Sequence, residues 1–145
     1  MNNHFYGWER ATVPALNREY PGIETPRDLY HALLGLWCAD TCAPRMRGEW
    51  TPGNPTFGQC SITAFLVQDI FGGRVYGVLL KDGSVHCFNV VDGRKFDITS
   101  QQFGDGKLNY DNCPEQLREV HFAREEKRQR YEKLKGMLRE KTAGR

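Results

Sequence analysis

The chain has 145 residues, of which 39% are hydrophobic and 26% charged, a composition typical of one globular domain with a modest core. Its net charge of +2 is too small to indicate a nucleic acid or a membrane surface as partner. The first residues lack a basic start followed by an apolar run, and no apolar stretch approaches the ~20 residues of a membrane-spanning helix. We therefore expect a cytoplasmic protein, whose five cysteines are thiols rather than a disulfide framework.

The first predicted helix runs from Pro26 to about Cys38. Thr25 is a suitable N-cap, Pro26 fits the first helical position, and apolar residues then recur at helical spacing. Pro44 excludes a regular continuation, and residues 45–57 contain enough proline and glycine to predict a loop.

A second helix is predicted from Cys60 to Phe71, because apolar residues mark one helical face and Gly72-Gly73 can end it. Three strands of β-branched and apolar residues are expected to follow, at Arg74–Lys81, Ser84–Val91 and Arg94–Ile98. The Asp-Gly pairs at 82–83 and 92–93 separate them and predict tight hairpin turns in which both central residues have positive φ.

A long C-terminal helix is predicted from Pro114 to about residue 141, capped by Asn112 or Cys113. Its distal apolar patch follows an almost wholly charged stretch, so we expect the helix to protrude and to dock on a partner subunit, which would make a homo-oligomer. The predicted fold is a single α+β domain over residues 1–145, with a core at about 25–103 and a small antiparallel sheet.

Three residues in a particular order suggest an activity class. Cys60 lies at a helix start, and His86 and Asp97 follow on neighbouring strands. A nucleophile, a base and an orienting acid are arranged in this way in several thiol enzymes. If residues 92–93 form a two-residue turn, Val91 pairs with Arg94, and His86 and Asp97 then share one face of the sheet as diagonal neighbours.

The start of the second helix would favour a thiolate, because the helix dipole and free backbone amides stabilise negative charge there. The same amides could hold an oxyanion, and the side chain of Gln59 could add a donor. Trp37 and Trp50 are candidates for lining a substrate cleft near Cys60, although core packing is the commoner role of such aromatic residues.

Two alternatives compete with the catalytic interpretation. A cysteine near a helix start is often a small buried apolar residue, and an aspartate after a strand often caps a turn. Zinc is a further alternative, because Cys38 and Cys42 lie one helical turn apart. They lack a second close pair of ligands among Cys60, Cys87, Cys113 and His31, so we expect no metal.

Several of these motifs together resemble the YunG-like family of small bacterial proteins, over roughly Leu33 to Phe103. The matching motifs are Asn54-Pro55, Gly58 to Ala64, Val67-Gln68-Asp69, Gly72-Gly73, His86 to Asn89, Phe96 to Thr99 and Gln102-Phe103, with Trp37, Thr41 and Trp50 upstream. This resemblance implies kinship and no particular reaction.

A broader resemblance is to transglutaminase-like and papain-like cysteine enzymes, which also carry Cys on a helix, His on a strand and Asp or Asn on the next strand. It implies a core in which the Cys60 helix packs on the sheet. It also implies that Cys60 is the nucleophile, His86 the general base and Asp97 the orienting acid.

The sequence therefore predicts a cysteine hydrolase or acyltransferase acting on an amide or thioester, with a peptide or acyl group as substrate and no cofactor. The alternative is a non-catalytic protein-interaction module that keeps the fold and binds its partner through the aromatic cleft or the long helix. A thiol redox sensor would need a second thiol near Cys60, and the sequence does not place one there.

Overall fold

The computed structural model describes residues 4–104 and 106–144. Its strands are β1 (Arg74–Leu79), β2 (Val85–Val91), β3 (Arg94–Phe96) and β4 (Glu115–Gln116), which form one antiparallel sheet in the order β3-β2-β1-β4. The α-helices are α1 (Pro26–Leu33), α2 (Cys60–Phe71), α3 (Arg118–His121) and α4 (Glu125–Ala143). Short 3-10 turns are η1 (Trp8–Arg10), η2 (Ala39–Thr41), η3 (Pro44–Glu49) and η4 (Ser100–Phe103).

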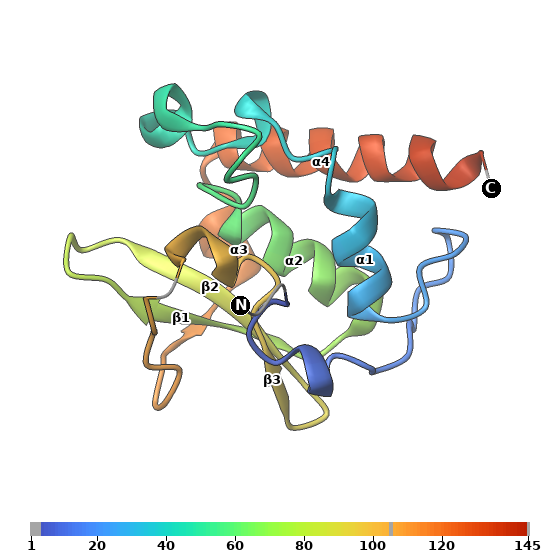
Figure 1. Cartoon of the computed structure of the whole chain (residues 1–145), viewed down its shortest axis with the longest axis horizontal. Coiled ribbons are helices and arrows are strands. Elements are labelled where there is room, and N and C mark those ends of the chain that lie inside the picture. Colours follow the sequence, from blue (N-terminus) through green and yellow to red (C-terminus); the bar gives the residue numbers. More distant parts are fainter. Residues whose placement is uncertain (1–3, 105, 145) are drawn as a thin grey trace.

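Helix α2 is the central element of the molecule. It packs on β1 and β2 on one side and on α4 on the other, so that sheet, α2 and α4 form successive layers (Figure 1). Its mostly buried sequence explains this position, because a helix that is apolar on nearly all sides must be covered on nearly all sides. The α+β class and the packing of the Cys60 helix on an antiparallel sheet are as predicted.

The first helix starts as predicted and ends early. Thr25 and Asp28 form a capping box around Pro26, but α1 stops at Leu33 instead of continuing to about Cys38. Gly35 adopts a φ of 92°, which a helix cannot contain and which glycine tolerates readily. The chain then turns back, and Trp37 enters the core rather than the last turn of a helix.

The two Asp-Gly pairs form different turns. Asp92 and Gly93 both have positive φ, as a two-residue hairpin turn requires, and Val91 pairs with Arg94 as predicted. In the other loop only Gly83 has positive φ, and the amide of Leu80 donates to the carbonyl of Ser84. That loop is therefore three residues long, and the prediction of positive φ at both of its residues is wrong.

The C-terminal region is not one helix from Pro114. Residues 115–116 form β4 on the edge of β1, where Val75 pairs with Gln116, and α4 begins only at Glu125. This pairing joins segments about forty residues apart, and helical periodicity carries no information on such a contact.

Helix α4 does not protrude. Its apolar side chains Tyr131, Leu134 and Leu138 are 2% exposed or less and belong to the same core as α2. The face that was expected to meet a partner subunit is therefore covered within the chain (Figure 1). Among the described residues, no helix is both long and apolar enough to cross a membrane.

Candidate active site

Cys60 is the first residue of α2, and a compact loop leads into it. Gly58 adopts a φ of 72°, and a Cβ atom there would collide with the sulfur of Cys42. The carbonyl of Gly58 also accepts a hydrogen bond from Ala43, which ties this loop to the start of η3. Within the described part of the chain, the backbone amides of Cys60 and Ser61 donate to no acceptor, as expected for the first turn of a helix.

His86 and Asp97 are hydrogen-bonded, with 2.7 Å between Nε2 and Oδ2, and each side chain is 1% exposed. The register that Asp92-Gly93 predicted brings them together, because it puts Asp97, just beyond β3, on the same sheet face as His86 in β2. With Nε2 bonded to the carboxylate, Nδ1 is the ring nitrogen left to exchange a proton with a nucleophile. The ring of Phe103 packs edge-on against the imidazole, with 4.8 Å between centroids.

Asp97 is held by more donors than His86 alone. The hydroxyl of Tyr110 donates to Oδ2 at 2.8 Å, and the amide and hydroxyl of Thr99 donate to Oδ1 at 3.1 and 3.2 Å. The ring of Tyr6 stacks on that of Tyr110, and the amide of Asp97 donates to the carbonyl of Tyr6. Burial and the adjacent carboxylate raise the pKa of Tyr110, so its hydroxyl stays a proton donor.

Tyr110→Phe removes one of these donors without changing the ring. Because the lost bond is to a buried carboxylate, we expect the free energy of unfolding to fall by about 2 kcal/mol in urea denaturation. Tyr76→Phe is the matched control. Tyr76 packs in the same cluster as Tyr110, on the sheet face of Phe88, and no described residue hydrogen-bonds its hydroxyl. Equal stabilities of the two variants would contradict this role of Tyr110.

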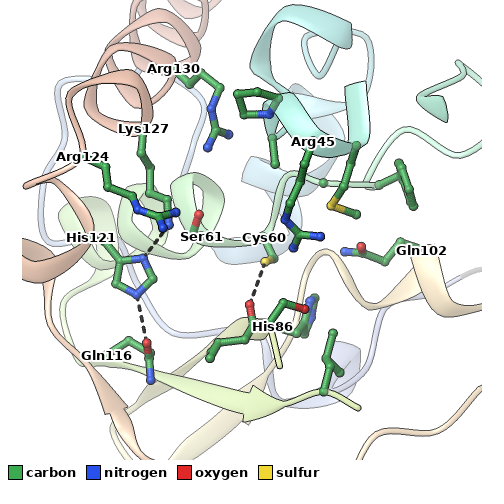
Figure 2. A pocket seen from close by; sticks show the side chains of 18 of the residues that line it. Arg45, Cys60, Ser61, His86, Gln102, Gln116, His121, Arg124, Lys127 and Arg130 are labelled. Atoms are coloured by element: carbon green, nitrogen blue, oxygen red, sulfur yellow. Dashed lines mark hydrogen bonds between the residues drawn. The ribbon is translucent and has the colours of Figure 1, made fainter. Parts of the chain in front are cut away.

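Cys60 lies beside an uncovered edge of β2. Its sulfur is 3.9 Å from the carbonyl oxygen of Val85 (Figure 2). The carbonyl of Ser84 bonds to Leu80, so that of Val85 points to the other side, where β3 has already ended at Phe96. From this edge the thiol meets side chains from both faces of the sheet.

The thiol and the imidazole shift each other's proton affinity. A hydrogen bond from the thiol of Cys87 and the positive charge of His86 lower the pKa of Cys60 well below 9.0, although burial opposes the shift. Burial would lower the pKa of His86, but the charges of Asp97 and Cys60 outweigh it and raise this pKa to about 10. The two shifts favour a thiolate beside an imidazolium over a neutral thiol beside a neutral imidazole.

Cys87 is the second thiol that the sequence did not place near Cys60. It lies on the sheet face covered by α2, opposite to the His86 face as predicted, and it is 1% exposed. Its own pKa is raised by the hydrogen bond to Cys60 and by burial, so it stays protonated.

A pocket of about 910 Å³ opens onto Cys60 and His86. The start of η3 and the loop before β2 form parts of its wall, and α3 and the start of α4 form another part (Figure 2). Ser61 also lines the pocket, so the first turn of α2 borders the same space as the thiol.

Three residues that were candidates for substrate contact or oxyanion binding point elsewhere. The amide of Gln59 donates to the carbonyl of Cys38 and the residue is fully buried. Trp37 donates to Thr63 in the core, and Trp50 donates to the carbonyl of Pro55. None of the three lines the described pocket, and the side-chain N–H donors of all three bond to other parts of the chain.

The pocket contains functional candidates that sequence reasoning missed. His121 was expected to be a surface or core histidine, but it lines the pocket, accepts a hydrogen bond from Lys127 at Nδ1 and donates from Nε2 to Gln116, both at 2.9 Å. Burial and the charge of Lys127 lower the pKa of His121 to about 4, so it is neutral at pH 7. The signal in the sequence was only a histidine near a basic helix.

The metal alternative finds no support in the arrangement of the thiols. Within residues 4–104 and 106–144, no group of three or more His, Cys, Asp or Glu side chains is placed to hold a metal ion. All five cysteines are free thiols, two of them buried.

Comparison with known proteins now gives the kinship of the chain. The model of the family described as "YunG protein" matches residues 25–143, which cover the pocket, the sheet and all of α4. The chain belongs to the YunG family. A curated member, "Uncharacterized protein YunG" of Bacillus subtilis (strain 168), is 36% identical over 72 residues, which are 50% of this chain and 61% of the relative.

The YunG membership carries no reaction with it, because the matched relative's name states none. No solved structure matches the chain. The broader resemblance to transglutaminase-like and papain-like enzymes therefore stays a prediction, and the function must be argued from the geometry of the site.

Proposed function

We propose that this YunG-family protein is a cysteine hydrolase or acyltransferase with Cys60 as nucleophile, His86 as base and Asp97 as orienting group. The buried 2.7 Å bond between His86 and Asp97, next to a thiol that opens onto a pocket, is the observation that carries the proposal. A buried ion pair of this kind costs desolvation energy, so its position beside a low-pKa thiol favours a chemical role.

The reaction follows from the protonation states. The Cys60 proton resides on His86, and the thiolate attacks the carbonyl carbon of an amide or thioester, forming the S–C bond. The resulting oxyanion is stabilised by the free amides of Cys60 and Ser61. As the carbonyl reforms, the bond to the leaving amine or thiol breaks, and His86 gives that group its proton.

The acyl-enzyme is resolved by a second nucleophile. His86 takes a proton from water or an amine, which attacks the thioester carbon, and then returns a proton to the Cys60 sulfur as the S–C bond breaks. Water gives a carboxylic acid and an amine gives a new amide. Asp97 keeps Nε2 protonated and so directs Nδ1 to the thiol. In this proposal the core is a small version of the papain-like and transglutaminase-like arrangement.

The interaction module loses both of its expected binding surfaces, because the apolar face of α4 is buried in the chain and Trp37 and Trp50 lie outside the described pocket. The thiol of Cys87, which lies near Cys60, is an observation in favour of a redox function. We favour acyl transfer because the pocket reaches Cys60 and His86 but not Cys87.

The test is formation of an acyl-enzyme from a simple activated ester. On mixing with p-nitrophenyl acetate, intact-mass spectrometry should show one acetyl group on the wild-type chain, mapped to Cys60, which then decays. In His86→Gln the acetylation rate at pH 7 should fall at least about 100-fold.

Cys113→Ser is the matched control, because Cys113 is a partly exposed thiol outside the pocket. It should acetylate like the wild type. Acetylation at Cys113 rather than Cys60, or equal rates in wild type and His86→Gln, would refute the proposed function.

A further inference from the structure

The lining of the pocket is rich in cations. Arg45, Arg124, Lys127 and Arg130 line it, together with only two carboxylates, Asp82 and Glu126. The carboxylate of Glu126 is used by Arg130, whose guanidinium is buried and also donates to the carbonyl of Thr41. Asp82 is exposed and accepts hydrogen bonds from Ser84.

Arg124 and Lys127 lack such a partner, because no carboxylate of the described residues pairs with either of them. The partner of Lys127 is Nδ1 of His121, which is a neutral acceptor, and burial lowers the pKa of Lys127. The thiolate of Cys60 is the anion that acts on this half-buried ammonium, and an anionic group entering the pocket would stabilise the ammonium further.

These cations lie around the nucleophile. Figure 2 shows the guanidinium of Arg45 on one side of Cys60, and Arg124 and Lys127 with His121 on the other. The negative charge of Cys60 raises the pKa of both Lys127 and His121, against the lowering by burial, as expected where the thiol lies near them. An anionic group of the substrate that is bound by Arg124 and Lys127 would therefore place the substrate's neighbouring carbonyl near the thiolate of Cys60.

We infer that the pocket takes an acyl substrate that carries an anionic group, a carboxylate or a phosphate, bound by Arg124 and Lys127 with Arg45 on the opposite side. This inference rests on the proposed function for the acyl step. The binding of the anion is independent of that step, so the two can be tested apart.

Alkylation of Cys60 by iodoacetate and by iodoacetamide tests anion binding separately from the acyl step. Both alkylate a thiolate with loss of iodide, but only iodoacetate is an anion, so the ratio of their rate constants at Cys60 does not depend on the thiolate fraction. For Cys60 of the wild type we expect the ratio of the iodoacetate rate constant to the iodoacetamide rate constant to be at least about tenfold higher than the same ratio for 2-mercaptoethanol. In Arg124→Gln and Lys127→Gln it should fall by about threefold or more.

Arg128→Gln is the matched control for charge. Arg128 lies one helical turn from Arg124, is exposed, pairs with Glu125 and does not line the pocket. Its ratio should equal that of the wild type. A wild-type ratio no higher than that of 2-mercaptoethanol, or equal ratios in Arg124→Gln, Lys127→Gln and Arg128→Gln, would overturn the inference.

Competition experiments identify the class of anion that the pocket binds. At constant ionic strength, acetate or inorganic phosphate should slow the alkylation of Cys60 by iodoacetate, and the stronger competitor identifies the class. Protection by neither anion would overturn the inference. The iodoacetamide rate alone, compared between wild type and His86→Gln, reports on thiol activation. Equal iodoacetamide rates in the two proteins, together with a high anion ratio in the wild type, would reject the proposed function and leave the anion site standing.

Discussion

Replacing Asp97 by Asn should cost the protein both stability and thiol reactivity. The substitution keeps the shape of the side chain but leaves the buried imidazolium of His86 without its counter-charge. Breaking a buried ion pair by removing one partner costs about 3–5 kcal/mol, and we expect the free energy of unfolding in urea to fall by about that amount.

The same variant should lose the low-pKa thiol. Without the carboxylate, the pKa of His86 drops and the imidazolium no longer lowers that of Cys60. Alkylation of Cys60 by iodoacetamide at pH 6 should slow by at least about tenfold.

Asp92→Asn is the matched control for this variant. Asp92 is exposed in the β2–β3 turn, and Asn accepts its positive φ equally well. Its stability should stay within about 0.5 kcal/mol of wild type. An Asp97→Asn protein as stable and as reactive as Asp92→Asn would remove Asp97 from the site.

The stability that the thiolate contributes should depend on pH with a defined sign. The folded pKa of Cys60 is lowered from 9.0, so its contribution is present above pH 9 and is lost as pH falls through the folded pKa. The folded pKa of His86 is raised from 6.5 to about 10, so its contribution is present below pH 6.5 and is lost as pH rises to about 10. In wild type the two trends oppose each other between pH 6.5 and 9.

Cys60→Ser isolates the thiolate. The difference in free energy of unfolding between wild type and Cys60→Ser should grow with pH by about 1.4 kcal/mol per unit, from the lowered pKa of Cys60 up to pH 9. Urea unfolding at several pH values measures this difference. A difference that is constant over the range would mean that the thiol is not ionised in the folded state.

Local signals in the sequence predicted what depends on neighbouring residues. The bounds of α2, the N-cap of α1 and the register of β2 with β3 follow from Gly72-Gly73, Thr25 and Asp92-Gly93. The last of these predicted that His86 and Asp97 share a sheet face, because one turn fixes the parity of both strands.

What could not be predicted depends on contacts between distant segments. Tyr110 lies in a stretch without periodicity, and only the folded chain brings its hydroxyl to Asp97. The β4 pairing and the burial of α4 depend on β1 and α2, so the sequence pattern suggested one protruding helix instead. The cations that line the pocket could not be predicted for the same reason. Arg45 in η3 and Arg124 and Lys127 near the start of α4 are distant in the sequence, and only the folded chain brings them to one pocket.

The central claim is that Cys60 and His86 form a thiolate–imidazolium pair, and the pH profile of Cys60 alkylation tests it most directly. The rate with iodoacetamide is followed on the Cys60 peptide by mass spectrometry in wild type and in His86→Gln, whose amide can still donate to Asp97. We predict a wild-type profile with its midpoint well below 9.0, which moves up in the variant because the imidazolium is lost while the hydrogen bond from Cys87 remains. A wild-type midpoint at or above 9.0, or a midpoint that the substitution leaves unchanged, would contradict the account.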